Sequence, residues 1–175
     1  MTIFTIGHST RTLAEFTELL AAAAVRELVD VRKLPGSRRY PHFNDDVLAR
    51  ELPESGISYR RVEALTGRRP VSRTVDFKVN GFWENRSFHN YADHALSEEF
   101  KTALRQLIDA AQGSPTAIMC SEAVWWRCHR RIIVDHLLAA GQDVRHIMGP
   151  GNTTAATLTA GAVIDDQGQV TYPGV

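Results

Sequence analysis

Cysteine is scarce in this chain of 175 residues, which contains only Cys120 and Cys128. So few cysteines exclude a disulfide-rich secreted scaffold, and no Cys-x-x-Cys or His-x-x-x-His pair gives the spacing of a zinc module. The spacing of the two cysteines permits a disulfide, but we expect free, reduced thiols.

Long apolar runs are also lacking, since no stretch approaches the roughly 20 residues that a membrane-spanning helix needs. The opening residues MTIFTIGH lack the basic flank and long apolar stretch of a signal peptide. We therefore expect a cytoplasmic protein that has no membrane partner.

An excess of charge of one sign is absent as well, because 20 basic and 20 acidic residues balance to a formal net charge of zero. Overall charge thus indicates neither a nucleic-acid coat protein nor a membrane-surface protein. The hydrophobic content of 43% suits one domain over residues 1–175, with a core of normal size.

Short apolar runs alternate with amphipathic stretches along the chain. Thr12 and Glu15 form a capping box, Asn44 and Ser97 are candidate helix caps, and a further helix is expected to begin near Arg127 and to run to Ala140. Strands are expected at residues 3–6, 27–31, 57–62, 116–120 and 144–148, with a terminal hairpin within 163–172. This order predicts a single three-layer α/β domain, with a mostly parallel, Rossmann-like sheet, helices on both faces and a C-terminal hairpin.

The segment TAIMCSEAVWWRCHRRIIVDHLL, residues 116–138, carries the strongest functional signal. Its apolar start predicts a buried strand that ends at Cys120 and Glu122. Cys128 and His129 would then lie near the N-terminus of the next helix. In an open α/β sheet, ligands bind at the carboxyl ends of the strands.

Polar residues follow the other predicted strands in the same way. His8 and Ser9 follow the first strand, Asp30 and Arg32 end the second, and His146 lies within the fifth. Because parallel strands end at one rim of the sheet, these residues predict an active or binding site there.

Four motifs in order resemble the domain of unknown function 488 family, up to about residue 148. They are TIGHST, LVDVRKLPGSRRYPHFN, NYADHAL, and MCSEAVWWRCHR followed by VRHI. The resemblance implies a compact α/β core over residues 1–148 in which these motifs cluster, with residues 149–175 as an extension, but it implies no settled reaction.

Asp30, Val31, Arg32 and Cys120 also resemble the matching positions of rhodanese-like domains. There, the resemblance implies a catalytic cysteine whose following loop wraps an anion and lowers the thiol pKa. The present loop departs from that pattern, since it contains Glu122 and two bulky tryptophans.

Three kinds of site remain open. Cys120 or Cys128 is a nucleophile or a packing residue, and the basic neighbours of Cys128 favour a thiolate. A metal site would use His8, Glu122, Cys128 and His129, but adjacent helical residues point about 100° apart, so no metal is predicted. The third kind is an acid/base and anion-binding site.

The leading hypothesis is an enzyme that acts on an anionic substrate, such as a nucleotide or nucleic-acid component. Catalysis is assigned to Glu122 as acid/base, His8 and His129 as proton-transfer groups and Cys128 as an assisting group. Substrate binding is assigned to Arg32, Arg130, Ser9, Asp30, Arg38 and Arg39.

Two alternatives stay open beside it. One is a noncatalytic nucleotide or nucleic-acid binding module that uses the basic loop around Arg38 and Arg39. The other is a thiol-dependent sulfur-transfer enzyme. The chain has no Walker or dinucleotide glycine motif, so the sequence identifies no cofactor, and it predicts no oligomeric state.

Overall fold

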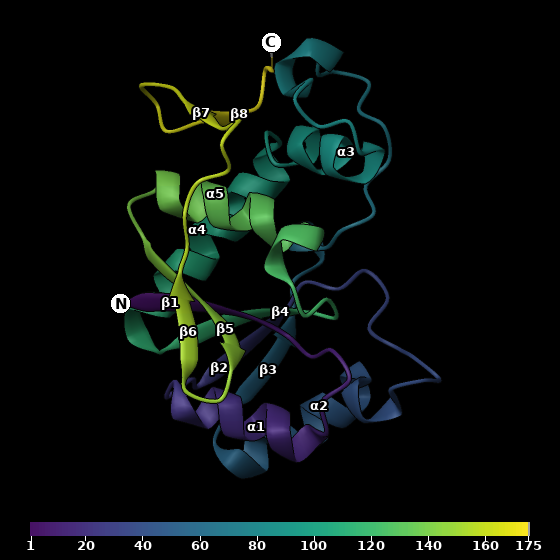
Figure 1. Ribbon diagram of the computed structural model, residues 1–175, viewed down its shortest axis with the longest axis vertical. Coiled ribbons are helices and arrows are strands. Elements are labelled where there is room, and N and C mark those ends of the chain that lie inside the picture. The colour runs from purple at the N-terminus through teal and green to yellow at the C-terminus, as the bar shows by residue number, and fades with distance from the viewer. Residues whose placement is uncertain (175) are drawn as a thin grey trace.

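A six-stranded sheet runs through the centre of the chain in the computed structural model, which describes residues 1–174 (Figure 1). The strand order is β3-β2-β4-β1-β5-β6, and only β6 is antiparallel to its neighbour. The strands are β1 (Thr2–Gly7), β2 (Glu27–Asp30), β3 (Ser58–Arg61), β4 (Thr116–Cys120), β5 (Asp143–Gly149) and β6 (Asn152–Ala155). This confirms the predicted α/β class and mostly parallel sheet.

The position of β4 determines which loops meet at the rim of the sheet. In the dinucleotide-binding fold the first two strands are neighbours, whereas here β4 lies between β1 and β2. The Rossmann-like part of the prediction is therefore not confirmed. All five residues of β4 are buried, as a central parallel strand requires.

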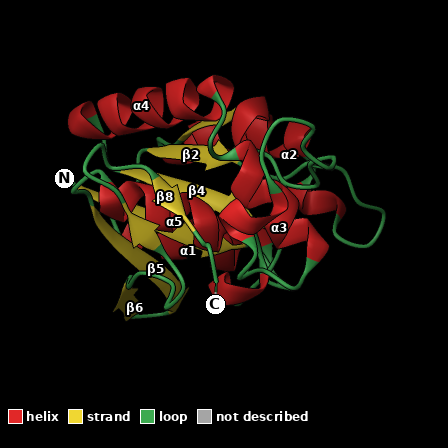
Figure 2. Cartoon of the chain, turned by 90° about the horizontal axis from the view of Figure 1, so that it is seen from above, coloured by secondary structure: helices red, strands yellow, loops and turns green. Residues whose placement is uncertain are grey.

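Helices cover both faces of the sheet, α1 and α2 on one and α3, α4 and α5 on the other (Figure 1). Seen from above, α5 lies over the middle of the sheet (Figure 2). The helices are α1 (Leu13–Ala22), α2 (Asp45–Glu51), α3 (Arg86–His94), α4 (Glu98–Gly113) and α5 (Arg130–Ala139). Each face of the sheet thus has its own apolar core.

The predicted helix starts are confirmed at α1 and α4. Thr12 and Glu15 form the capping box, and the Ser97 side chain accepts the N–H of Phe100. Asn44 precedes α2 as expected, but its side chain makes no cap. Its Oδ1 instead accepts the Ser37 N–H at 2.7 Å, which fixes the preceding loop.

The helix expected to begin near Arg127 is present as α5, but it begins three residues later, so its predicted start is corrected. A short 3₁₀ turn spans Trp125–Arg127, and α5 starts at Arg130. Cys128 between them has extended backbone, with φ −138° and ψ 167°. The break places the Cys128 side chain in front of the N-terminus of α5 instead of on its surface.

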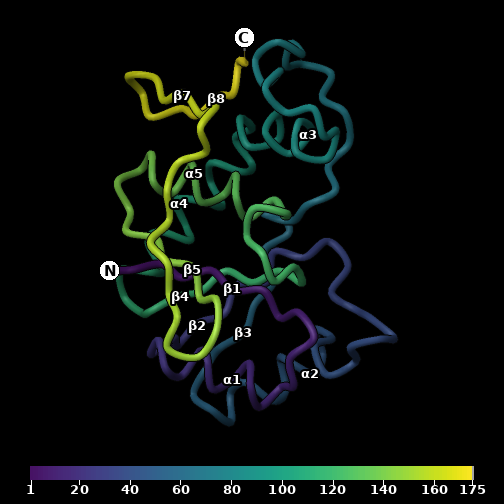
Figure 3. The backbone as a smooth tube through the Cα atoms, in the orientation of Figure 1, coloured from purple at the N-terminus to yellow at the C-terminus, as the bar shows by residue number. Residues whose placement is uncertain are grey.

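The predicted terminal hairpin is confirmed as β7 (Val163–Ile164) and β8 (Val170–Thr171). The chain end lies beside the 77–82 segment (Figure 3), where Tyr172 exchanges backbone hydrogen bonds with Val79 and Phe82. Tyr172 also donates its hydroxyl to the buried Asp135 at 2.7 Å. Among residues 1–174, no helix is long and apolar enough to cross a membrane.

Candidate thiol site

The structure brings both cysteines together at the carboxyl end of β4. Their sulfur atoms are 3.1 Å apart, which exceeds the ~2.05 Å of a disulfide bond. Both are free thiols, with Cys120 buried and Cys128 partly buried. The seven residues between them, 121–127, form the loop that returns the chain from the sheet to α5.

Backbone contacts with the end of β1 hold this loop in place. The N–H groups of His8 and Ser9 donate to the carbonyls of Cys120 and Ser121, at 2.9 and 3.0 Å. A Cβ on Gly7 would lie 1.8 Å from the carbonyl oxygen of Glu122. Only glycine therefore permits the close approach of β1 to this loop.

Cys128 is the more acidic of the two thiols. Its sulfur accepts from both the backbone N–H and the Nε of Arg130, each at 3.3 Å. Burial acts to raise the pKa of Cys128, but the Cys120 hydrogen bond and the Arg130 charge together lower it to about 6. Cys128 is consequently a thiolate at neutral pH.

Cys120 has the opposite environment. Burial raises the pKa of its thiol well above the ordinary value, and the hydrogen bond to Cys128 and the nearby negative charge raise it further. Cys120 therefore stays protonated and donates to the Cys128 thiolate.

Arg130 holds the two cysteines and their loop in place through its hydrogen bonds. Its side chain is 1% exposed, and it donates to Thr5 Oγ1 at 3.2 Å and to the Glu122 carbonyl at 2.7 Å. Within residues 1–174 it makes no ion pair with a carboxylate. The charge of this buried guanidinium is thus balanced by the Cys128 thiolate.

Thr5 links Arg130 to His146. Thr5 Oγ1 accepts from Arg130 and is also hydrogen-bonded to His146 Nδ1, 2.6 Å away. Burial and the Arg130 charge lower the pKa of His146 to about 4, so the ring is neutral. His146 therefore supports Arg130 from inside the sheet and does not face the rim.

A cavity of about 390 Å³ opens beside the two sulfur atoms. It lies at the carboxyl ends of β2 and β4, where the sequence predicted a site. Its walls combine both cysteines with basic and polar side chains: Arg32, Lys33, Leu34, Gly67, Arg68, Asn85, Ser87, Phe88, Cys120, Ser121, Glu122, Arg127, Cys128 and His129.

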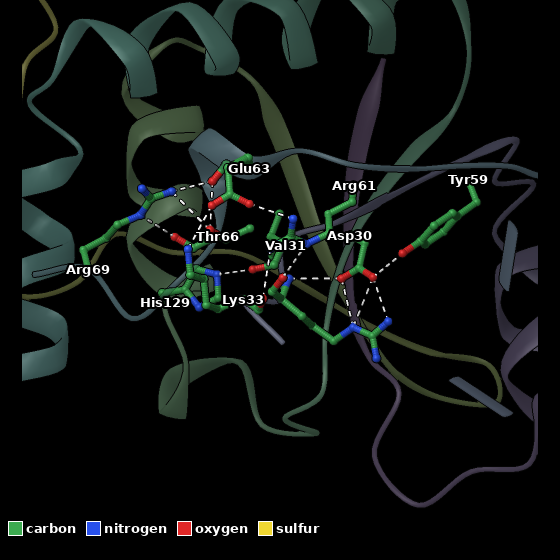
Figure 4. Close-up of polar contacts among 10 residues, drawn as sticks. Asp30, Val31, Lys33, Tyr59, Arg61, Glu63, Thr66, Arg69 and His129 are labelled. Atoms are coloured by element: carbon green, nitrogen blue, oxygen red, sulfur yellow. Dashed lines mark hydrogen bonds and ion pairs between the residues drawn. The ribbon is translucent and has the colours of Figure 1, made fainter. Parts of the chain in front are cut away.

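His129 lines this cavity as a neutral group. Its Nε2 donates to the Val31 carbonyl at 2.8 Å (Figure 4), which leaves Nδ1 without a hydrogen. Burial is the main reason that its pKa falls to about 4. A Cβ on Gly67 would lie 2.8 Å from Nδ1, so His129 packs directly on the 66–69 loop.

Arg32 and Asp30 form a buried ion pair at the end of β2. Arg32 Nη2 lies 2.7 Å from Asp30 Oδ2, and the Tyr59 hydroxyl donates to the same carboxylate at 2.5 Å (Figure 4). Arg32 also donates to the Phe43 carbonyl. Most of its donors are therefore occupied, although the side chain reaches the cavity wall.

Six of the ten predicted site residues do not line the cavity: Asp30 and Arg130, described above, and His8, Ser9, Arg38 and Arg39. His8 stacks on Phe43 with ring centroids 4.4 Å apart, and burial lowers its pKa to about 4. The backbone carbonyl of Ser9 accepts a hydrogen bond from His8 Nδ1 at 2.9 Å. Arg38 and Arg39 are exposed on the loop that follows β2. The cavity wall thus includes Cys128, His129, Glu122 and Arg32, and Arg130 contacts Cys128. His8 and Ser9 support the wall only through their backbones, and Arg38 and Arg39 do not contribute to it.

Glu122 reaches the site mainly through its backbone. Its carbonyl accepts from Arg130 and lies 3.6 Å from the Cys120 sulfur, whereas its side chain is exposed and makes no hydrogen bond within the described chain. The acid/base role of Glu122 stays a prediction. No group of three or more metal-ligating side chains occurs in residues 1–174.

Part of the cavity wall comes from residues that the sequence patterns did not assign to a site. Arg68 and Asn85 belong to the stretch between β3 and α3, which has little regular structure, and Ser87 and Phe88 lie in the first turn of α3. This stretch lacks the hydrophobic periodicity that would place it against the sheet. The arginines at residues 60–73 are a sequence signal for this part of the wall.

Comparison with known proteins identifies a family but no individual relative. The family model described as domain of unknown function DUF488 matches residues 12–137, a range that includes both cysteines and α5 up to Leu137. No curated protein and no solved structure matches the chain.

Proposed function

The chain belongs to the DUF488 family, and we propose that it is a thiol-dependent oxidoreductase in which Cys128 attacks a sulfur electrophile and Cys120 completes the reaction. One observation carries this proposal. The Cys128 sulfur lies 3.1 Å from the Cys120 sulfur and 3.3 Å from Arg130 Nε, at the wall of a cavity.

The first step is the attack of the Cys128 thiolate on a disulfide, RS–SR. A bond forms between Cys128 and one sulfur, the S–S bond of the substrate breaks, and RS⁻ leaves. The Arg130 N–H groups hold the thiolate in the ionised form that this attack needs.

The second step is the attack of Cys120 on Cys128. In the resting state, the negative charge of Cys128 helps to raise the pKa of Cys120, and the charge of Arg130 lowers it. Once Cys128 is in a mixed disulfide its charge is gone, so Cys120 ionises more readily and gives its proton to the released RS⁻. The Cys120–Cys128 disulfide forms, the second RS⁻ leaves, and a dithiol reductant restores both thiols.

This proposal uses the predicted residues differently from the leading sequence hypothesis. Cys128 becomes the nucleophile, Arg130 stabilises it, and His129 holds the cavity loop as a neutral ring. The proposal needs no proton transfer by Glu122 or His8, because the thiolate is already ionised.

Mass spectrometry tests the two roles separately. We would treat the reduced, folded protein at about pH 7 with hydroxyethyl disulfide. The wild type should lose the mass of two hydrogens, Cys120→Ser should retain a mixed disulfide, and Cys128→Ser should retain no adduct. Equal reaction of Cys128→Ser and wild type, or no reaction of the wild type, would contradict the proposal and favour a binding module.

A further inference from the structure

Resting on the proposed function, we infer that the substrate is a small disulfide that carries negatively charged groups, and that Arg68 and Arg127 bind those groups. Both arginines line the cavity beside Cys128. This assignment moves anion binding away from Arg32, Arg130, Arg38 and Arg39.

The other cations at the cavity already have partners. Arg32 pairs with Asp30 at 2.7 Å, and the Nζ of Lys33 lies 2.9 Å from Glu63 Oε1. These pairs neutralise much of the field that either cation would exert on a ligand.

Arg68 and Arg127 are different, because both are exposed and their side chains make no hydrogen bond or ion pair within residues 1–174. They come from separate segments, the loop after β3 and the 3₁₀ turn before Cys128. A guanidinium with unoccupied donors on a cavity wall binds carboxylates well, since its planar fork matches their two oxygens.

The backbone around Arg68 is anchored although its side chain is free. Gly67 packs on the His129 ring, and Arg69 Nε donates to the Thr66 carbonyl at 3.0 Å (Figure 4). Arg68 itself has φ +56°, a conformation that is unfavourable for a residue with a Cβ. The loop is thus fixed on both sides of Arg68, which limits where its guanidinium can reach.

The cavity also limits the size of the substrate. A volume of about 390 Å³ lies at the lower end of small-molecule sites and admits a small disulfide with its charged groups. Glu122 contributes one exposed carboxylate to the same wall. It opposes an anionic substrate, so its removal should increase the preference for negative charge.

Three disulfides of similar size provide the test: dithiodipropionate is a dianion, hydroxyethyl disulfide is neutral, and cystamine is a dication. We would measure the rate constant of each with reduced protein at low salt and divide it by the rate with a free small thiol, which corrects for intrinsic reactivity. The normalised rates should decrease in the order dianion, neutral compound, dication.

Variants assign the effect to residues. Arg68→Gln and Arg127→Gln should each lower the normalised rate for the dianion about fourfold, as expected for one charge pair ~5 Å apart in a solvated cavity. The rate for hydroxyethyl disulfide should stay within about twofold, and Glu122→Gln should raise the dianion rate by a similar factor. Arg38→Gln, at an exposed arginine that does not line the cavity, is the matched control.

The outcomes separate this inference from the proposed function. Equal normalised rates for the three disulfides, or dianion rates that Arg68→Gln and Arg127→Gln leave unchanged, would overturn the substrate class while the thiol chemistry stands. Failure of Cys128 to react with any of the three would overturn the proposed function itself.

Discussion

The acidity of Cys128 gives the most direct test of the site. Alkylation of the reduced protein by iodoacetamide should follow a titration curve with its midpoint near pH 6, the lowered pKa of Cys128. The physical reason is that Arg130 donates to the Cys128 sulfur from its backbone N–H and from Nε. Only the thiolate reacts, so the rate follows ionisation.

The lowered pKa has two opposite effects on the rate. At pH 7 a thiol of pKa 6 is about 90% ionised, whereas a thiol of pKa 9 is about 1% ionised, a gain of roughly 90-fold. A thiolate that is less basic by about three pKa units is roughly 20-fold less nucleophilic, with a Brønsted coefficient near 0.45. Alkylation at pH 7 should therefore be about four times faster than for an ordinary cysteine, and the plateau, compared above about pH 10, should be roughly 20-fold lower.

The assay is intact-mass measurement of the reduced protein over a range of pH, with peptide mapping to locate the adduct. Cys120 should remain unmodified at neutral pH, because burial raises its pKa and hides its sulfur. A single adduct on Cys128 is the expected product.

Arg130→Met is the informative variant, since it removes the charge and the Nε donor but retains apolar volume. The midpoint should move upward, toward the ordinary cysteine value, while Arg130→Lys, which keeps the charge, should give an intermediate value. A wild-type midpoint above about pH 8, or equal midpoints for wild type and Arg130→Met, would refute the reasoning.

Two further predictions concern stability. Gly67→Ala places a Cβ 2.8 Å from His129 Nδ1 and should lower the free energy of unfolding by about 1–3 kcal/mol in denaturant titrations. Gly36→Ala is the control, because the space around its new Cβ is open. Equal losses of stability in the two variants would contradict the packing of Gly67 on His129. Burial, with a smaller effect of Lys101, lowers the pKa of His136 to about 4, so this ring favours the folded state fully above about pH 6.5 and that contribution is lost as pH falls toward 4. Between about pH 7 and pH 4.5, His136→Leu should consequently lose roughly 2–3 kcal/mol less stability than wild type, and parallel pH profiles would show that His136 is not the titrating group.

Much of the fold follows from local sequence signals. The short apolar run at residues 116–120 predicts β4 with its observed ends. A strand that is buried on both faces needs no alternation of apolar and polar residues. Thr12 with Glu15, and Ser97, mark helix starts through hydrogen bonds that span only three residues. Such short-range contacts can be read directly from the sequence.

The carboxyl edge of the sheet was also predictable, and the basic neighbours of Cys128 indicated a thiolate, but the contact between the two cysteines was not predicted. A helix that began at Arg127 would have placed Cys128 within its first turn. The Cys128 sulfur would then not have accepted the backbone N–H of Arg130. The observed 3₁₀ turn and the extended Cys128 instead direct the sulfur back to Cys120 and to the start of α5. Hydrophobic periodicity does not reveal such a break, since the apolar stripe of α5 begins only at Ile132.

The sequence also did not predict which arginines pair with carboxylates. These pairings decide what the cavity can bind. Arg32 and Arg68 look alike in sequence, yet Asp30 neutralises one and no described residue pairs with the other. Arg130 shows the strongest version of this dependence, because a fully buried guanidinium without a carboxylate requires another anion. In this fold that anion is the Cys128 thiolate, so oxidation of Cys128 leaves Arg130 without its charge partner. Under the proposed function, this charge pair stabilises the reduced, ionised form relative to the disulfide, and the oxidised form would then accept electrons readily from a dithiol.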